Sequence, residues 1–319
     1  MKKIALFLFL MAFGYLGFNF FFTPLVQTSY GFYHWKQNYS IEKSETNPPS
    51  YIKVLDISYD KGLKIFKTSF KTVPTQKIIP VIYLDNPLFL NIRATTLLKQ
   101  VMKALKEMEL TAYSEIQVDC DWSGKTKKRY FEFLKILKEQ SNKRISATIR
   151  LHQVKYYSKT GVPPVDYGVL MYYNMSDFTD IETKNYILDL EVSSAYHYNF
   201  DTYPLPLNLA LPLYSQATII RFSKVVGLME GVRTKDININ FKKLENNRYE
   251  VLKTHYFKKR LLYEGDIIRI DEVSLSLLKK SLLGLSKVMK QPKEIIFYRW
   301  GNRAFYGDDA LTKLLHFWN

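Results

Sequence analysis

The feature that most constrains the fold of this chain is a regular alternation of short, apolar, strand-like runs with amphipathic helical stretches. Such alternation is typical of α/β proteins, in which helical crossovers connect parallel strands. The strand-like runs lie at 33–37, 51–58, 78–84, 115–122, 145–152, 167–173, 207–214 and 294–300. Eight strands with crossovers in roughly 290 residues match the size of one (β/α)8 TIM barrel, which is the α/β fold class that we predict.

Helical periodicity between these runs predicts the crossover helices. The helices are expected at 92–108, 131–137, 183–196, 217–229, 273–289 and 309–318. Between the first two strands the chain is too short for a helix and contains Pro48 and Pro49. Between the last two strands, residues 236–270 have the pattern of strand, turn and strand. We therefore expect a barrel domain at 29–319 that carries a small β insertion at 236–270.

The start of the chain predicts its compartment. Lys2 and Lys3 precede an almost uninterrupted apolar run at 4–22, which is the pattern of an export signal. The run is also long enough to span a bilayer as an uncleaved anchor. We expect residues 1–28 to be a signal peptide or an N-terminal membrane anchor, and the protein to be exported to the periplasm or cell envelope. A buried core helix is the alternative.

The composition narrows the choice of partners. The net charge of +16, from 46 Lys and Arg against 30 Asp and Glu, would suit a polyanion. We expect no nucleic-acid partner, because the leader exports the chain and no nucleic-acid-binding motif is present. The excess basic residues lie mostly on expected outer helices and on the insertion, which are solvated faces. Since Cys120 is the single cysteine, a thiolate zinc site is excluded. We expect no metal, no cofactor and a monomer.

The fourth strand carries two carboxyl groups at its end. Strand alternation places Asp119 and Asp121 on the barrel interior and Trp122 on the helix-covered outside. Active sites of TIM barrels form at the carboxyl ends of the strands. Two carboxylates this close raise the pKa of one of them unless they are otherwise stabilised. We interpret the pair as catalytic or ligand-binding, with a satisfied structural pair as the alternative.

Other strand ends add polar and aromatic groups. On the fifth strand, Arg150 and His152 share the face of the aspartates, so Arg150 can offset their charge. His152 is a candidate proton carrier or hydrogen-bonding ring, with a structural histidine as the alternative. No second histidine lies at ligand spacing, so a metal site is not predicted. Aromatic residues such as Trp35, at or near strand ends, suit a sugar ligand because sugars present apolar CH faces to rings.

Four segments resemble the chitinase-type glycoside hydrolases of family eighteen. The sequence DCDWS at 119–123 is similar to the end of that family's fourth-strand motif, DxxDxDxE. The segment 171–174 is similar to its MxYD, and 209–215 to its GxPxYG. Trp300 lies where the family places a sugar-stacking tryptophan, and the insertion has a counterpart there. Over residues 30–303 the chain resembles more closely an uncharacterised bacterial family of glycoside-hydrolase-like barrels.

The resemblance implies a glycoside-hydrolase-like envelope protein that acts on a polysaccharide or glycan. Since the motif's other carboxyls are present, we assign Asp121 as the acid, Asp119 as its pKa partner and Tyr173 as a donor to an acetamido or ring oxygen. From the strand ends and the family motifs together, the predicted substrate-binding residues are Trp35, Arg150, His152, Asn174, Tyr214 and Trp300.

The chain departs from the family where its catalytic glutamate would be, because Ser123 occupies that position. Asn174 likewise replaces an aspartate of the family motif. If the protein is an enzyme, its acid must be another carboxyl: Asp121 itself, or one from a neighbouring strand end. The neighbouring candidates are Asp56, Asp85 and Asp166. The alternative function is a catalytically inactive glycan-binding or scaffold barrel.

Overall fold

The computed structural model describes residues 28–318. The apolar run at 4–22, and with it the predicted signal peptide or anchor, lies outside the described residues. Within the described range, no helix combines the length and the apolar character needed to cross a bilayer.

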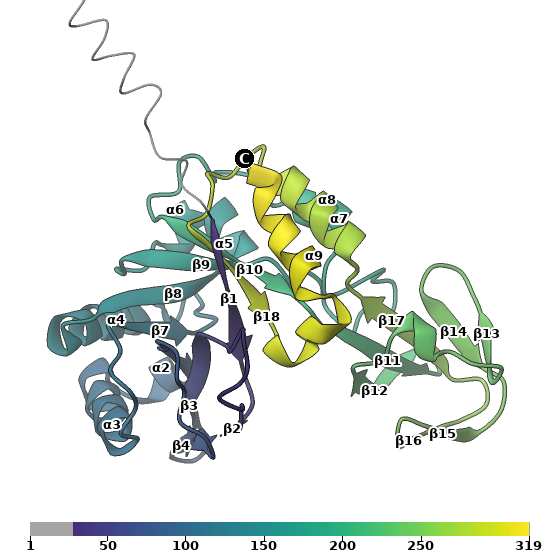
Figure 1. The fold of residues 1–319 in the computed structure, drawn as a ribbon, viewed down its shortest axis with the longest axis horizontal. Helices are drawn as coiled ribbons and strands as arrows, with labels where there is room; N and C mark the ends of the chain where they lie inside the picture. Colours follow the sequence, from purple (N-terminus) through teal and green to yellow (C-terminus); the bar gives the residue numbers. More distant parts are fainter. Residues whose placement is uncertain (1–27, 319) are drawn as a thin grey trace, which may run out of the picture.

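Eight parallel strands form a closed barrel, which confirms the predicted fold (Figure 1). In chain order they are β1 (Ser29–His34), β3 (Tyr51–Tyr59), β6 (Ile79–Leu84), β7 (Glu115–Asp119), β8 (Arg144–Arg150), β9 (Tyr167–Met171), β10 (Leu207–Pro212) and β18 (Glu294–Tyr298). Around the ring the order is β1-β18-β10-β9-β8-β7-β6-β3, and pairing of β1 with β3 closes it. Outside the ring, β4 (Leu63–Lys67) pairs antiparallel with β3, and β2 (Asn38–Tyr39) pairs with β5 (Ser69–Phe70).

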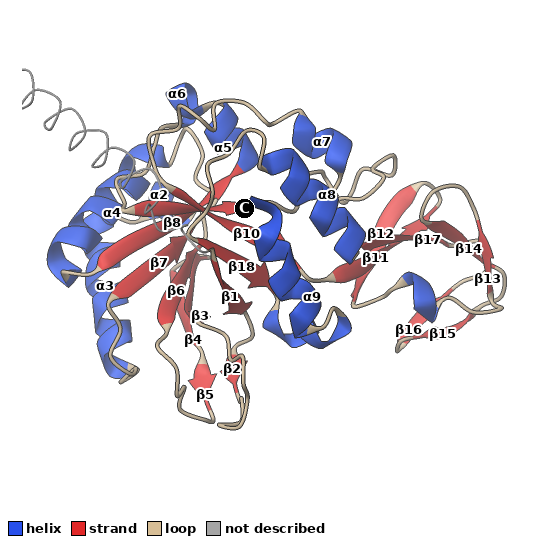
Figure 2. Cartoon of the chain, turned by 45° about the horizontal axis from the view of Figure 1, so that its top comes forward, coloured by secondary structure: helices blue, strands red, loops and turns tan. Residues whose placement is uncertain are grey.

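Helices cover the outside of the strands (Figure 2). The longer ones are α3 (Ala94–Glu107), α4 (Lys127–Ser141) and α8 (Leu275–Leu285), all within or around predicted helices. The shorter ones are α2 (Leu88–Asn91), α5 (Leu151–Lys155), α6 (Tyr157–Thr160), α7 (Leu190–Ser194) and α9 (Asp308–Lys313). The 3-10 helices are η1 (Thr234–Asp236), η2 (Trp300–Phe305) and η3 (Leu314–Trp318). The helix expected at 183–196 is reduced to α7, because backbone bonds from Asn174 to Ile187 and from Met175 to Tyr186 hold the preceding segment as a loop.

A second sheet projects from one side of the barrel (Figure 1). Five antiparallel strands form it in the order β12-β11-β17-β14-β13. They are β11 (Ser215–Arg221), β12 (Lys224–Glu230), β13 (Phe241–Lys243), β14 (Arg248–Val251) and β17 (Ile267–Glu272), and the hairpin of β15 (His255–Phe257) and β16 (Arg260–Leu262) packs beside them. The helix predicted at 217–229 is wrong, because this segment forms the hairpin of β11 and β12. Both turn residues, Phe222 and Ser223, have positive φ, as a tight hairpin requires.

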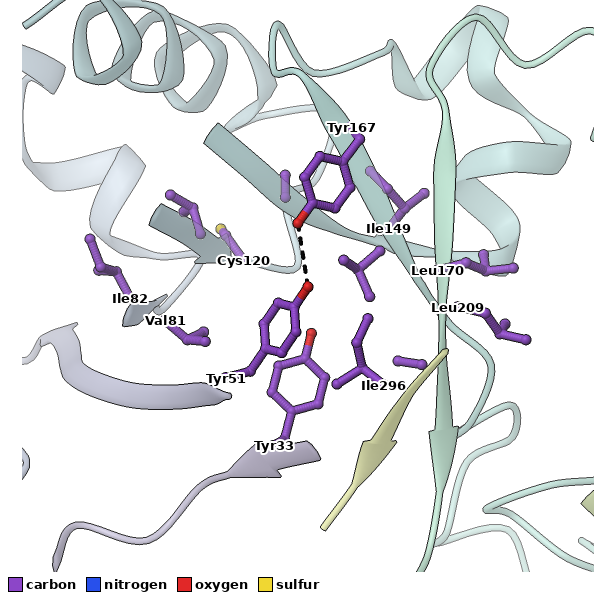
Figure 3. Close-up of a cluster of buried hydrophobic side chains, with 14 of the residues drawn as sticks. Tyr33, Tyr51, Val81, Ile82, Cys120, Ile149, Tyr167, Leu170, Leu209 and Ile296 are labelled. Carbon is purple, nitrogen blue, oxygen red and sulfur yellow. Dashed lines mark hydrogen bonds between the residues drawn. The ribbon is translucent and has the colours of Figure 1, made fainter. Parts of the chain in front are cut away.

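Tyrosine side chains lie inside the barrel (Figure 3). The Tyr51 hydroxyl donates to Glu294 Oε2 (2.6 Å), and the Tyr167 hydroxyl donates to Glu115. The Tyr33 hydroxyl donates to Gln117 Oε1 (2.6 Å). Buried polar groups cost little when they are hydrogen-bonded in this way. Packed side chains therefore occupy the barrel interior below the mouth, and a cavity remains at the carboxyl ends of the strands.

Candidate active site at the barrel mouth

A cavity of about 270 Å³ lies at the carboxyl ends of the barrel strands. Its walls include every predicted site residue except His152 and Trp300. The fold therefore brings together carboxyl, guanidinium and aromatic groups from five different strand ends. The predicted residues in the cavity are Asp119, Asp121, Tyr173, Trp35, Arg150, Asn174 and Tyr214.

Asp119, the last residue of β7, is 6% exposed. Its Oδ1 accepts a hydrogen bond from Thr148 Oγ1 on β8 (2.6 Å). Burial, and then the nearby charge of Asp121, raise the pKa of Asp119 to about 7, against the lowering effects of Thr148 and Arg150. At neutral pH this carboxyl is therefore poised between its protonated and ionised forms.

Asp121 lies two residues further along, and its side chain is 57% exposed. Arg150, at the end of β8, donates from one guanidinium nitrogen to Asp121 Oδ2 (2.8 Å) and from the other to the backbone oxygen of Asn174 (3.1 Å). Arg150 thus links the ends of β7 and β9, and it pairs with the exposed carboxylate rather than with the buried one. The carboxyl with the raised pKa is therefore Asp119, whereas Asp121 is the acid that we predicted from the sequence.

Aromatic rings form the opposite wall of the cavity. Tyr298, at the end of β18, stacks on Tyr173 with ring centroids 5.3 Å apart and an interplanar angle of 8°. Trp35 and Tyr214 meet Tyr298 edge-on at 5.8 and 5.6 Å. The Tyr214 hydroxyl donates to Asn174 Oδ1, so the amide oxygen of Asn174 orients Tyr214. Tyr173 is buried, so Trp35 and Tyr298, which are partly exposed, are the rings of this wall that a sugar could contact.

Two predicted binding residues lie elsewhere. β8 ends at Arg150, and His152 belongs to α5, where it is exposed and lines only a small hollow beside the mouth. The strand alternation that we extended to position 152 fails because the chain turns into a helix after Arg150. Trp300 opens η2, and its indole nitrogen donates to the backbone oxygen of Asn47 (2.7 Å). It lines a neighbouring groove rather than this cavity.

The alternative acids do not line the cavity. Asp166 precedes β9, at the opposite end of the barrel, and binds Lys138 Nζ (2.7 Å) and the backbone N–H of Ile145 (2.8 Å). Asp56 is paired with Lys53 (2.8 Å). Ser123 lies in the loop before α4, where its backbone N–H donates to Thr126 Oγ1 (2.9 Å). Asp119 and Asp121 are thus the carboxyl groups that line the mouth within the described part of the chain.

Several residues of the site were not predicted from the sequence. Thr148 lies on the polar face of the fifth strand, so its alternation was available as a signal. Arg299 follows β18, and its guanidinium makes two bonds to Glu230 at the end of β12 (2.9 and 3.1 Å). Gln216 belongs to β11 and accepts from the Tyr186 hydroxyl (2.9 Å). No local sequence pattern predicts the contacts of Arg299 and Gln216, because they join the barrel to the insertion or the insertion to a loop.

Histidine, cysteine and carboxyl side chains do not gather as a metal site. Over residues 28–318, no group of three or more such residues is placed to hold an ion. Cys120 is buried on the outer side of β7, away from the mouth. Trp122 also lies outside, stacked on Tyr130 of α4, as the alternation predicts.

Solved structures with the same barrel include several glycoside-cleaving proteins. The C-terminal domain of a protein named as a chitinase from Desulfitobacterium hafniense is 11% identical with a TM-score of 0.54, over 85% of this chain and 91% of that one. The Bacillus cereus spore cortex-lytic enzyme SleL is 13% identical with a TM-score of 0.49, over 85% of this chain and 67% of that one. The chitinase ChiB from Flavobacterium johnsoniae is 11% identical with a TM-score of 0.47, over 84% and 85%.

Sequence comparisons add no closer relative. No protein-family model matches the chain. No curated protein matches it either. The chain has the barrel fold of chitinase-type glycoside hydrolases, at a sequence identity that relates the folds alone.

Proposed function

We propose that this chain is a glycoside-hydrolase-like protein of the cell envelope that binds a polysaccharide at the barrel mouth, with Asp119 as the proton donor. The observation that carries the proposal is a buried carboxyl with a pKa of about 7 in a cavity walled by aromatic rings. Near neutral pH such a group is protonated in about half of the molecules, which suits a general acid. The fold shared with the Desulfitobacterium domain supports a polysaccharide as the ligand.

In the proposed reaction, Asp119 gives its proton to the leaving oxygen as the glycosidic C–O bond breaks. Asp121, which is paired with Arg150, stabilises the positive charge that develops at the anomeric carbon. An acetamido oxygen of the substrate, positioned by Tyr173, attacks that carbon. Water then opens the intermediate and returns a proton to Asp119. Such a route needs one protein acid and one orienting carboxylate, which the mouth contains.

The second candidate is a catalytically inactive barrel that only binds glycan. Ser123 favours it, because a serine hydroxyl cannot replace the family's glutamate as an acid near neutral pH. The retained aromatic wall of Tyr173, Tyr298 and Trp35 would still bind sugar rings.

Hydrolysis separates the two candidates. We would measure release of reducing ends from chitin, peptidoglycan and envelope polysaccharides by the natural chain, by Asp119→Asn, and by Asp60→Asn as an exposed-carboxyl control. For an enzyme, Asp119→Asn should lower kcat by about 100-fold or more while binding is retained, and Asp60→Asn should change neither. Binding by the natural chain without any product would establish the inactive barrel.

The sequence-based location is part of the proposal. We propose that the protein is exported and stays at the membrane through residues 4–22, as a monomer. The apolar run behind Lys2 and Lys3 supports this placement. Fractionation of cells that produce the full chain, against cells that produce residues 28–319 behind a cleavable signal, tests it: only the full chain should sediment with membranes.

A further inference from the structure

The described chain enters the barrel at the end opposite the mouth. Thr28 lies directly before β1, and its hydroxyl donates to the backbone oxygen of Pro292 (2.9 Å), just before β18. The backbone N–H of Ser29 donates to the backbone oxygen of Lys293 (3.0 Å). These bonds fix the point at which the chain enters the barrel. The arrow of β1 points from this end toward the mouth (Figure 1).

The proposed membrane anchor at 4–22 is close to this point in the sequence. Only residues 23–27 separate the anchor from Thr28. Five residues span at most about 18 Å when fully extended. An anchor at 4–22 therefore keeps the amino ends of the barrel strands next to the bilayer surface. The mouth lies about 16 Å further away, the rise of the six residues of β1 at the usual tilt of a barrel strand.

A hollow of about 340 Å³ lies at the same end of the barrel. Its walls come from the starts of β8, β9 and β10 and from the segment before β18. Three exposed basic residues line it, namely Arg144, Lys290 and Lys293. Two carboxyls also line it, but Asp166 is paired with Lys138 Nζ (2.7 Å), and only Asp201 is exposed to solvent. Basic charge therefore predominates around the hollow.

Lys290 and Lys293 are the cations of this hollow that can bind a partner. Arg144 lies 3.8 Å from the buried carboxyl of Glu115, so its charge is partly used inside the protein. Neither lysine forms an ion pair within residues 28–318. Both are exposed and flank Pro292, which binds Thr28. Basic residues beside a membrane segment attract anionic lipid headgroups, and this attraction acts over about one Debye length.

We propose that the amino-end face of the barrel, defined by Thr28, Arg144, Lys290 and Lys293, docks on an anionic bilayer. Lys290 and Lys293 pair with lipid phosphates, and the anchor keeps the face within reach of them. The inference rests on the anchoring by residues 4–22 that is part of the proposed function, and it adds the orientation of the barrel. The mouth then opens away from the membrane, toward polysaccharide that lies beyond the bilayer surface.

Amine acylation of the full chain in lipid vesicles tests the docking. The vesicles would contain phosphatidylcholine alone or phosphatidylcholine mixed with phosphatidylglycerol, and the reagent would not cross the bilayer. Mass spectrometry then gives the acylation rates of Lys293 and of Lys125, an exposed lysine between β7 and α4 at the mouth end. Phosphatidylglycerol should slow the acylation of Lys293 by about threefold or more and leave Lys125 unchanged. High salt should remove this protection because it screens the charges.

Lys290→Glu and Lys125→Glu are matched charge reversals at the two ends of the barrel. Lys290→Glu should reduce the protection of Lys293 to about half or less, since it repels the same headgroups. Lys125→Glu should leave that protection unchanged. Equal acylation of Lys293 in both kinds of vesicle overturns the docking. Protection that survives both high salt and Lys290→Glu also overturns it, because such protection would not come from charge pairing.

Flotation of the same samples tests the anchor separately. A chain that floats with neutral vesicles but shows no protection of Lys293 has the anchor and refutes the docking. A chain that floats only with anionic vesicles, with Lys293 protected, supports the docking and refutes the anchor. A chain that floats with neither refutes both. Neither readout requires glycan hydrolysis, so the catalytic part of the proposed function is tested independently.

Discussion

Replacing Asp119 by asparagine should make the protein more stable at alkaline pH. The pKa of this carboxyl is about 7 in the folded protein and 3.8 in its ordinary state. The folded protein thus holds the proton more tightly than the unfolded chain, so Asp119 lowers the stability as pH rises from 3.8 to 7. Asparagine keeps an acceptor for the Thr148 hydroxyl and carries no charge at any pH in this range.

The size of the effect follows from the rise in pKa. A rise of about three pH units corresponds to about 4 kcal/mol of lost stability once the pH exceeds 7. At pH 5 the same carboxyl costs about 1.7 kcal/mol, because the unfolded chain is already mostly ionised there. Between pH 5 and pH 8, Asp119→Asn should therefore gain about 2.6 kcal/mol relative to the natural chain.

Urea denaturation of both proteins at pH 5 and pH 8 measures this gain. Other buried carboxyls such as Asp271, whose pKa is raised to about 6, titrate in both proteins and cancel in the difference. Asp60→Asn, which replaces an exposed carboxyl by the same amide, is the matched control. A stability difference that is the same at pH 5 and pH 8 would refute the reasoning, and with it the assignment of Asp119 as the protonated group.

Further changes test the surroundings of Asp119 and the two sheets. Thr148→Val removes a bond that lowers the pKa of Asp119, so the alkaline limb of the pH profile of kcat/KM should move upward by about half a pH unit or more. Arg269→Met leaves Asp271 buried without its ion-pair partner, since both side chains are 0% exposed, and should cost about 3–5 kcal/mol by denaturation. Gly168→Ala places a Cβ atom 2.6 Å from Ile149 Cγ1 inside the barrel wall and should cost about 1–3 kcal/mol in the same measurement.

Strand alternation explains what could be predicted from the sequence. In a barrel with helices outside, residues two apart share a face, and this places Asp119 inside and Trp122 outside. Strand alternation cannot identify a strand whose buried residues do not alternate with exposed ones. Residues 215–220 of β11 are all buried, polar and apolar alike, so their sequence has no period of burial that separates a strand from a helix. Nor does Phe222-Ser223 carry the Asn-Gly or Gly signal that usually marks a tight hairpin.

The candidate site could be predicted only where its residues share a strand or its neighbour. Asp119, Asp121 and Arg150 lie on, or just after, the adjacent strands β7 and β8, whose approximate positions the sequence predicts, although both strands end earlier than predicted. The bonds from Arg299 to Glu230 connect residues far apart in the chain, and their positions depend on how the insertion packs on the barrel. Asp119, the last residue of β7, is buried and has the raised pKa, whereas Asp121, two positions later in the loop, is exposed. The sequence does not reveal this difference in exposure.

The order of strands around the barrel gives the mouth a polarity. In an eight-membered ring with the order β1-β18-β10-β9-β8-β7-β6-β3, β7 and β18 lie four steps apart in either direction and so face each other. Asp119 and Asp121 follow from β7, whereas Tyr298 and Arg299 follow from β18. A glycan across the mouth would therefore meet its proton donor on one wall and its stacking ring and cationic donors on the other. The bond that Asp119 protonates should then lie beside β7, and the sugar that packs on Tyr298 should lie beside β18, so that one glycan chain spans the mouth between the two strands.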